Sequence, residues 1–114
     1  MDTLFVIYVF FSFVLIALAI PLTVKRIGPN IFYGFRVPAT LKDKDIWYPV
    51  NQLLGKWLLA SAIIFLVAAI GLYFIPGITL DQYSLGSLAG FAIPFGIGMV
   101  YMVRLLRKLT NRRT

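Results

Sequence analysis

The sequence has 114 residues, of which 61% are hydrophobic and 13% are charged, and its mean hydropathy is +0.90. About a quarter of the residues of a soluble domain are charged, so this composition predicts an integral membrane protein with one domain, residues 1–114. The chain contains no Cys and no His, which excludes disulfides, thiol nucleophiles, Cys/His metal sites and histidine acid–base catalysis. We therefore expect no enzyme activity, no metal and no cofactor.

The first predicted membrane span covers residues 4–24, an apolar run interrupted only by one Ser, one Pro and one Thr. Such a helix is about 30 Å long, which matches the thickness of the hydrocarbon core. A cleavable signal peptide is the alternative interpretation, because residues 17–19 read Ala-Leu-Ala. The amino end offers Asp2 and no Lys or Arg, whereas a signal peptide begins with positive charge. This favours a helix that is retained.

Residues 25–56 mix polar, aromatic, Gly and Pro residues densely, unlike the segments on either side. Residues 40–43 have the spacing of a capping box, and Asp43 could itself be the cap, so a helix is expected to begin here. The spacing of Trp47, Val50 and Asn51 then predicts one face of an amphipathic helix that runs toward the next span. Pro49 lies inside this pattern and predicts a kink or a break before the membrane helix.

The second predicted span covers residues 57–75, in which Ser61 is expected to bond to its own helix backbone. The third covers residues 85–103 and is followed by a basic tail, residues 104–114. Gly86 and Gly90 have the four-residue spacing that lets helices approach closely. We favour packing within the bundle as their role, and a homo-oligomer contact through the same face is the alternative.

The distribution of positive charge predicts the topology. All 11 Lys and Arg residues lie in residues 25–56 or in the tail, so the positive-inside rule places the amino terminus outside and the carboxyl terminus in the cytoplasm. The expected fold is all-α, with three transmembrane helices and an interfacial cytoplasmic loop and helix between the first two. The predicted spans carry no Asp, Glu, Lys or Arg, which disfavours a stand-alone pump or ion-coupled transporter. The tail has no nucleic-acid-binding pattern and is expected to contact anionic lipid.

Arg36 is the strongest candidate for a binding residue. Its planar guanidinium lies in sequence beside Phe35 and close to Tyr33. Such a group can hold a phosphate or a carboxylate with two hydrogen bonds while it stacks on aromatic rings. An internal ion pair with Asp43 or Asp45 is the alternative role, and the sequence leaves both open.

Ten residues between positions 30 and 56 form one ungapped pattern. They are Asn30, Tyr33, Gly34, Arg36, Pro38, Thr40, Trp47, Asn51, Gly55 and Lys56. This pattern resembles the signature of the SdpI family, small bacterial membrane proteins named for a toxin-immunity protein. Gln52 departs from it, because the family often has a basic residue at this place. We take the ten residues as the candidate binding signature.

The resemblance implies a protein of the bacterial cytoplasmic membrane that protects the cell against a secreted antimicrobial toxin. In the founding system the same protein also sequesters a transcriptional repressor at the membrane. The expected partners are therefore membrane lipids and either a toxin peptide or a cytoplasmic regulator. Two alternative functions stay open: a small lipid-binding or transport component, and an adaptor that recruits a cytoplasmic protein through residues 25–56. In the immunity hypothesis the signature folds back into the inner mouth of the bundle, which Arg36 closes.

Overall fold

The computed structural model describes residues 2–24 and 38–113. These residues form four helices, α1 (Asp2–Thr23), α2 (Pro38–Lys42), α3 (Lys44–Tyr73) and α4 (Leu80–Arg113). The helices α1, α3 and α4 are each long and apolar enough to cross a membrane. The chain is therefore an all-α membrane protein with three transmembrane helices, as the sequence predicts.

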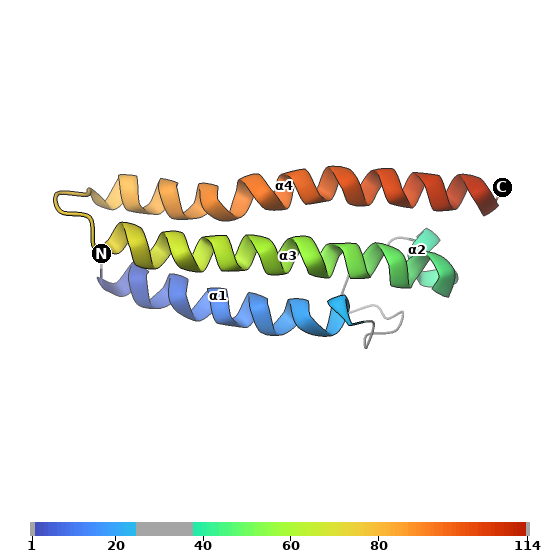
Figure 1. Ribbon diagram of the computed structural model, residues 1–114, viewed down its shortest axis with the longest axis horizontal. Helices are drawn as coiled ribbons and strands as arrows, with labels where there is room; N and C mark the ends of the chain where they lie inside the picture. The colour runs from blue at the N-terminus through green and yellow to red at the C-terminus, as the bar shows by residue number, and fades with distance from the viewer. Residues whose placement is uncertain (1, 25–37, 114) are drawn as a thin grey trace.

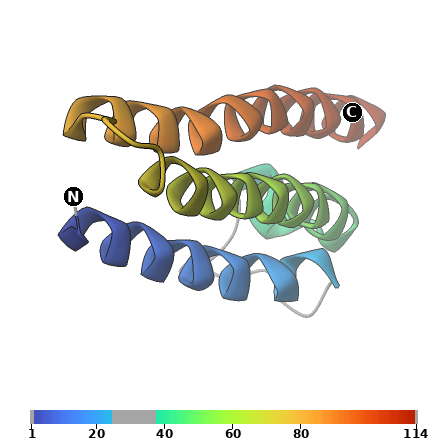
Figure 2. The ribbon, with the colours of Figure 1, turned by 60° about the vertical axis from the view of Figure 1, so that its left-hand side comes forward.

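The three long helices lie side by side with α3 in the middle (Figures 1 and 2). α3 runs antiparallel to both of its neighbours (Figure 1). It packs extensively against α1 and α4, whereas α1 and α4 barely contact each other. The short helix α2 packs against α3. The bundle is consequently elongated, with extents of 56 × 22 × 18 Å, and its integrity depends on the two faces of α3.

In the described part of the bundle, many large apolar side chains are exposed and many of the buried residues are small. Large apolar side chains such as Val67, Phe74 and Leu85 are mostly exposed. Half of the buried positions in the three long helices are small: Ser12, Ala19, Gly55, Ser61, Ala62, Ala69, Ser87 and Gly98. This distribution is expected in a bilayer, where acyl chains solvate large apolar groups and close contact between small residues holds helices together.

The buried hydroxyl groups that form hydrogen bonds within α1 and α3 use carbonyls of their own helix. Ser12 donates to the carbonyl of Tyr8 at 2.7 Å, and Ser61 donates to the carbonyl of Trp57 at 2.6 Å. The bond of Ser61 confirms the prediction from sequence. Such bonds satisfy a polar group where no water is available to do so.

Two glycines mark the points of closest approach between α3 and its neighbours. A Cβ atom placed on Gly55 would lie 2.6 Å from the backbone nitrogen of Thr23 and 2.9 Å from the carbonyl oxygen of Ala19. A Cβ atom on Gly98 of α4 would overlap the ring of Trp57, which stacks on Tyr101 at 5.6 Å between centroids. Because the atoms facing Gly55 belong to the backbone, a side chain there could be accommodated only if the helices separated.

Gly86 and Gly90 lie against α3 within the same chain. A Cβ atom on Gly86 would meet the side chain of Leu72, and one on Gly90 would meet Ala68 at 3.4 Å. The four-residue spacing therefore serves the packing of α4 on α3. A homo-oligomer contact through this face stays a prediction.

The sequence predicts a kink or a break at Pro49. A break is wrong, because α3 is one continuous helix from Lys44 to Tyr73, and a kink stays a prediction. Pro49 is only the sixth residue of this helix, so it removes only the hydrogen bond that the carbonyl of Asp45 would otherwise accept. The first turn is held on one side by the N-cap Asp43, whose carboxylate accepts from the backbone N–H of Asp45 at 2.9 Å. Burial of Val50 holds the following turn.

The helices α3 and α4 extend beyond the end of α1 (Figure 1). α1 has 22 residues, α3 has 30 and α4 has 34, which correspond to about 33, 45 and 51 Å. Because α1 ends beside Gly55, residues 44–54 of α3 and 99–113 of α4 form an α3–α4 extension. Its core contains Ile46, Val50 and Met102. The predicted tail, residues 104–114, is thus helical as far as Arg113.

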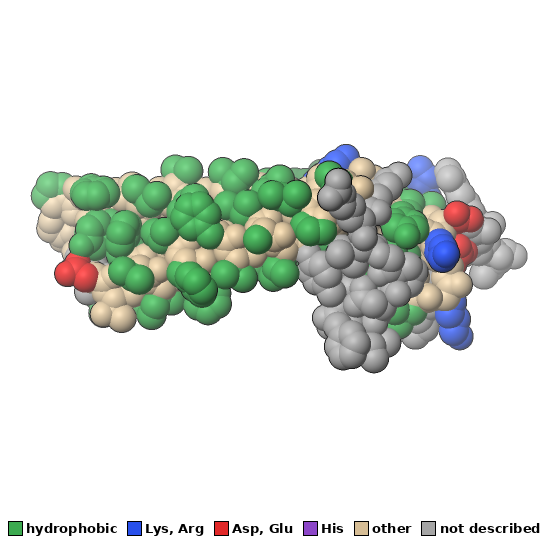
Figure 3. Space-filling model, turned by 90° about the horizontal axis from the view of Figure 1, so that it is seen from below, with side chains coloured by type: hydrophobic (Ala, Val, Ile, Leu, Met, Phe, Trp, Pro, Cys, Tyr) green, Lys and Arg blue, Asp and Glu red, His purple; other side chains and the backbone are tan. Residues whose placement is uncertain are grey.

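Charge separates the two ends of the bundle. Asp2 and Asp81 are the charged residues described at one end, which we call the acidic end. Lys42, Lys44, Arg107 and Lys108 lie at the other, which we call the basic end although it also contains Asp43 and Asp45. Figure 3 shows hydrophobic side chains over the described surface between the two ends of this face. The stretch of the bundle between its two charged ends is about as long as α1, and it matches the thickness of a hydrocarbon core, about 30 Å.

We predict that Gly55→Ala destabilises the bundle by about 1 to 3 kcal/mol, because the new methyl group overpacks the backbone of α1. Reversible unfolding in mixed micelles, followed by circular dichroism, measures the effect. Gly71→Ala is the matched control in the same helix, since a Cβ there meets nothing within 4 Å and Ala favours the helix by up to about 1 kcal/mol. Equal stability of the two variants would contradict the close approach at Gly55.

Candidate functional site

The structure describes six of the ten predicted signature residues, and all six lie in α2 or in the first half of α3. Asn30, Tyr33, Gly34 and Arg36 lie outside the described residues, as does the proposed closure of the bundle by Arg36. Pro38 begins α2, which also contains Thr40. The other four, Trp47, Asn51, Gly55 and Lys56, follow along α3.

The junction between α2 and α3 is closely packed. Asp43 is the N-cap of α3, which confirms the prediction that a helix begins at this aspartate. Thr40 and Trp47 on either side of it are both fully buried, with 0% of each residue exposed. A buried indole cannot act as an exposed anchor for a partner, so the structure places Trp47 in the packing of the bundle.

Asn51 is held within its own helix. It is 2% exposed, and its side-chain nitrogen donates to the carbonyl of Trp47 at 3.1 Å. Gly55, one turn later, is buried against α1, whereas Lys56 is exposed. The described part of the signature is therefore largely a packing pattern that fixes α2 and α1 on α3.

Gln52 of α3 forms a hydrogen bond to the last turn of α1. Its side-chain nitrogen donates to the carbonyl of Thr23 at 3.1 Å, one of the last carbonyls of α1, which have no partner within their helix. The sequence marked Gln52 only as a departure from the family pattern. Its spacing of three residues from Gly55 was the available signal, because residues so spaced share a helix face.

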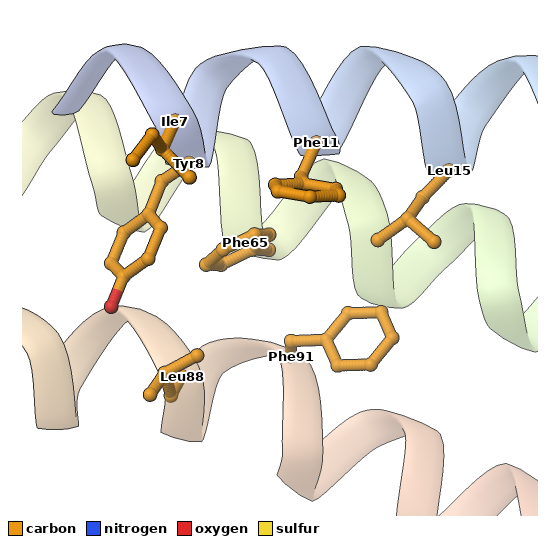
Figure 4. Close-up of a pocket in the computed structure, with 7 residues that line it drawn as sticks. All are labelled: Ile7, Tyr8, Phe11, Leu15, Phe65, Leu88 and Phe91. Atoms are coloured by element: carbon orange, nitrogen blue, oxygen red, sulfur yellow. The ribbon is translucent and has the colours of Figure 1, made fainter. Parts of the chain in front are cut away.

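A second site, which the sequence analysis missed, is an apolar groove between α1 and α4. Its volume is about 270 Å³, and Figure 4 shows the side chains around it. The lining residues are Ile7, Tyr8, Phe11 and Leu15 of α1, Phe65 of α3, and Leu88 and Phe91 of α4. The groove exists because α1 and α4 pack on α3 and barely contact each other. We call it the α1–α4 groove.

Aromatic contacts fix the walls of the α1–α4 groove. Tyr8 lies 5.2 Å from Phe65 between ring centroids and stacks on Tyr83 at 5.8 Å. Phe65 in turn meets Phe91 edge to face at 6.0 Å. Tyr83 is fully buried, and its hydroxyl donates to the carbonyl of Ala69 at 2.8 Å. These contacts join all three long helices, and rings in such arrangements stabilise packing beyond the area that they bury.

The accessible lining of the groove is apolar, although Tyr8 is one of the residues that line it. The ring of Tyr8 extends from α1 toward α4, with its hydroxyl at the far end (Figure 4). Among the described residues, none forms a hydrogen bond with this hydroxyl. A pocket with an apolar lining is suited to apolar groups of a ligand. The signal in the sequence was the spacing of Tyr83, Phe91 and Phe95, which places these rings on one face of α4.

Comparison with known families agrees with the resemblance carried by the signature. A model described as the SdpI/YfhL protein family matches residues 26–103. The chain belongs to this family. The match includes α2, α3 and α4 as far as Val103, so Gly55 and Gln52 lie inside it and their contacts on α1 lie outside. No curated protein and no solved structure matches the chain.

We predict that the bond from Gln52 to Thr23 protects the last turn of α1. Gln52→Leu removes the donor and should cost about 0.5 to 1.5 kcal/mol, with faster amide hydrogen exchange at Val24, whose N–H bonds to Ile20. Gln52→Lys should exchange like the parent chain, because an ammonium group can donate to the same carbonyl and is favoured at a helix carboxyl end. Unchanged exchange in Gln52→Leu would show that this bond does not hold the turn.

Proposed function

We propose that the chain protects the cell that makes it against a secreted antimicrobial peptide, and that it binds this peptide inside the membrane. Membership of the SdpI/YfhL family supports the protective role. The observation that carries direct binding is the α1–α4 groove, which is apolar, rich in aromatic rings and open between two transmembrane helices. A ligand could reach it from the lipid without crossing the bundle.

We propose the bacterial cytoplasmic membrane as the location, with the acidic end outside and the basic end in the cytoplasm. The distribution of Lys and Arg supports this orientation. The groove residues of α1, residues 7–15, then lie about 8 to 20 Å from Asp2 along the helix, from the outer half of the bilayer to just past its middle. A peptide that enters from outside would meet the groove before it meets the signature segment.

The chemistry of the groove fits the apolar face of a helical peptide. Its volume accommodates side chains of such a helix rather than the helix itself, so the peptide backbone would lie along the opening between α1 and α4. The phenyl rings that line the groove would contact the apolar side chains of the peptide. A peptide held in this way is unavailable to assemble into a membrane lesion.

We predict that expression of the intact chain in a toxin-sensitive bacterium raises survival against an SDP-type peptide. An inert membrane protein with three spans, produced at the same level, is the control for general effects of membrane protein expression. Filling the groove with Leu88→Trp should remove most of this protection, because an indole would occupy the space that the peptide needs. Leu88 is 48% exposed, so the larger side chain can be accommodated without disrupting the fold.

Ile93→Trp is the matched control for the groove variant. Ile93 lies in the same helix, is 63% exposed and does not line the groove, so protection should be retained. If both variants protect fully, the peptide is not bound in this groove. If the parent chain fails to protect at normal membrane levels, the immunity proposal fails for this peptide.

An adaptor that recruits a cytoplasmic regulator is the second candidate function, and the α3–α4 extension favours it. This extension has its own core around Ile46, Val50 and Met102, and in the proposed orientation it presents residues 25–56 to the cytoplasm. Protection that survives groove filling, but is lost when the regulator is deleted from the host, would favour the adaptor. A lipid-binding or transport component would not require that protection survive groove filling, nor that it depend on the regulator.

A further inference from the structure

A shallow depression on α4 combines apolar side chains with two arginines. It has a volume of about 330 Å³ and is lined by Met99, Val100, Val103, Arg104 and Arg107. Positions 100, 103, 104 and 107 are spaced so that they share one face of the helix. Val100, Arg104 and Arg107 are exposed. The depression therefore changes from apolar to cationic within two helical turns.

The depth of this depression in the membrane follows from the helix lengths. Asp81 and Arg104 are 23 positions apart in the sequence, with no charged residue between them, which corresponds to about 35 Å of helix. Trp57 stacks on Tyr101, which is close to Arg104 in the sequence, and Trp and Tyr are enriched where the hydrocarbon meets the headgroups. The apolar residues of the depression thus face acyl chains, and the arginines lie at the level of the headgroups.

Both guanidinium groups are available to a ligand. Among the residues whose side chains the structure describes, 2–24 and 40–111, none forms an ion pair or a hydrogen bond with the side chain of Arg104 or Arg107. An arginine can donate two parallel hydrogen bonds to a phosphate. Two of them one turn apart, next to an apolar surface, match the layout of a phospholipid, in which a phosphate adjoins acyl chains.

We propose that this depression is a binding site for one anionic phospholipid of the leaflet at the basic end. The phosphate contacts Arg104 and Arg107, and an acyl chain lies along Val100 and Val103. The site is separate from the α1–α4 groove and does not depend on the immunity proposal. Its occupant would anchor the α3–α4 extension to the membrane surface at a fixed depth.

Native mass spectrometry of the full chain in detergent tests this site. Dioleoyl phosphatidylglycerol and dioleoyl phosphatidylcholine are added in equal amounts, so that only the headgroup differs. We expect one phosphatidylglycerol to be retained in preference. The double variant Arg104→Gln/Arg107→Gln should weaken its binding by about 10- to 30-fold, since each basic residue near the surface contributes about a factor of five.

Lys44→Gln/Lys108→Gln is the control variant, because it removes the same charge from exposed positions that do not line the depression. It should retain the bound lipid. Equal loss in both double variants would overturn the proposal in favour of general attraction by a basic surface. Competition by soluble glycerol phosphate as strong as that by the intact lipid would also overturn it, because the acyl chain would then contribute nothing. Unfolding midpoints equal to that of the parent chain confirm that the variants are folded.

Discussion

Backbone atoms of α1 lie directly against Gly55 of α3, and most of the architecture depends on this approach. Apolar helices gain little from meeting each other in a solvent of acyl chains, so their association requires close contact along small residues. The contact also fixes where α1 ends relative to α3. Because Thr23 lies beside Gly55, the segment that connects α1 to α2 starts at this level, and the first turns of α3 extend past the end of α1.

Local signals predicted much of the fold. A long apolar run specifies a membrane helix whatever its neighbours are, and Asp43 caps α3 through a bond to the N–H of Asp45 only two residues away. The break expected at Pro49 did not follow, because proline disrupts a helix chiefly by removing bonds within it, and near the amino end few bonds are lost. The α1–α4 groove was missed for a different reason: it requires knowing that α1 and α4 both pack on α3 and not on each other.

The described signature residues show how a packing pattern can resemble a binding motif. Thr40, Trp47 and Asn51 are polar or aromatic and would suit a recognition surface, yet they are buried. A polar side chain can be buried inside such a junction where a backbone carbonyl accepts its hydrogen bond, as the carbonyl of Trp47 does for Asn51. Position 55 requires glycine because a Cβ atom there would overlap the backbone of α1. The surfaces that we propose for ligands in the described part of the chain therefore lie elsewhere, in the groove and at Arg104 and Arg107.

The α1–α4 groove and the depression at Arg104 and Arg107 both include residues of α4. The contacts that hold α4 on the bundle therefore connect the two surfaces. The close contact of α4 with α3 at Gly98 lies toward the basic end, whereas the groove lies toward the acidic end, where the Tyr8–Tyr83 stack and the bond from Tyr83 to Ala69 tie α4 to both other helices. Between these points α4 faces α1 across the groove with little direct contact. A lipid that fixes the basic end of α4 would consequently set the depth at which Leu88 and Phe91 line the groove, without touching either residue.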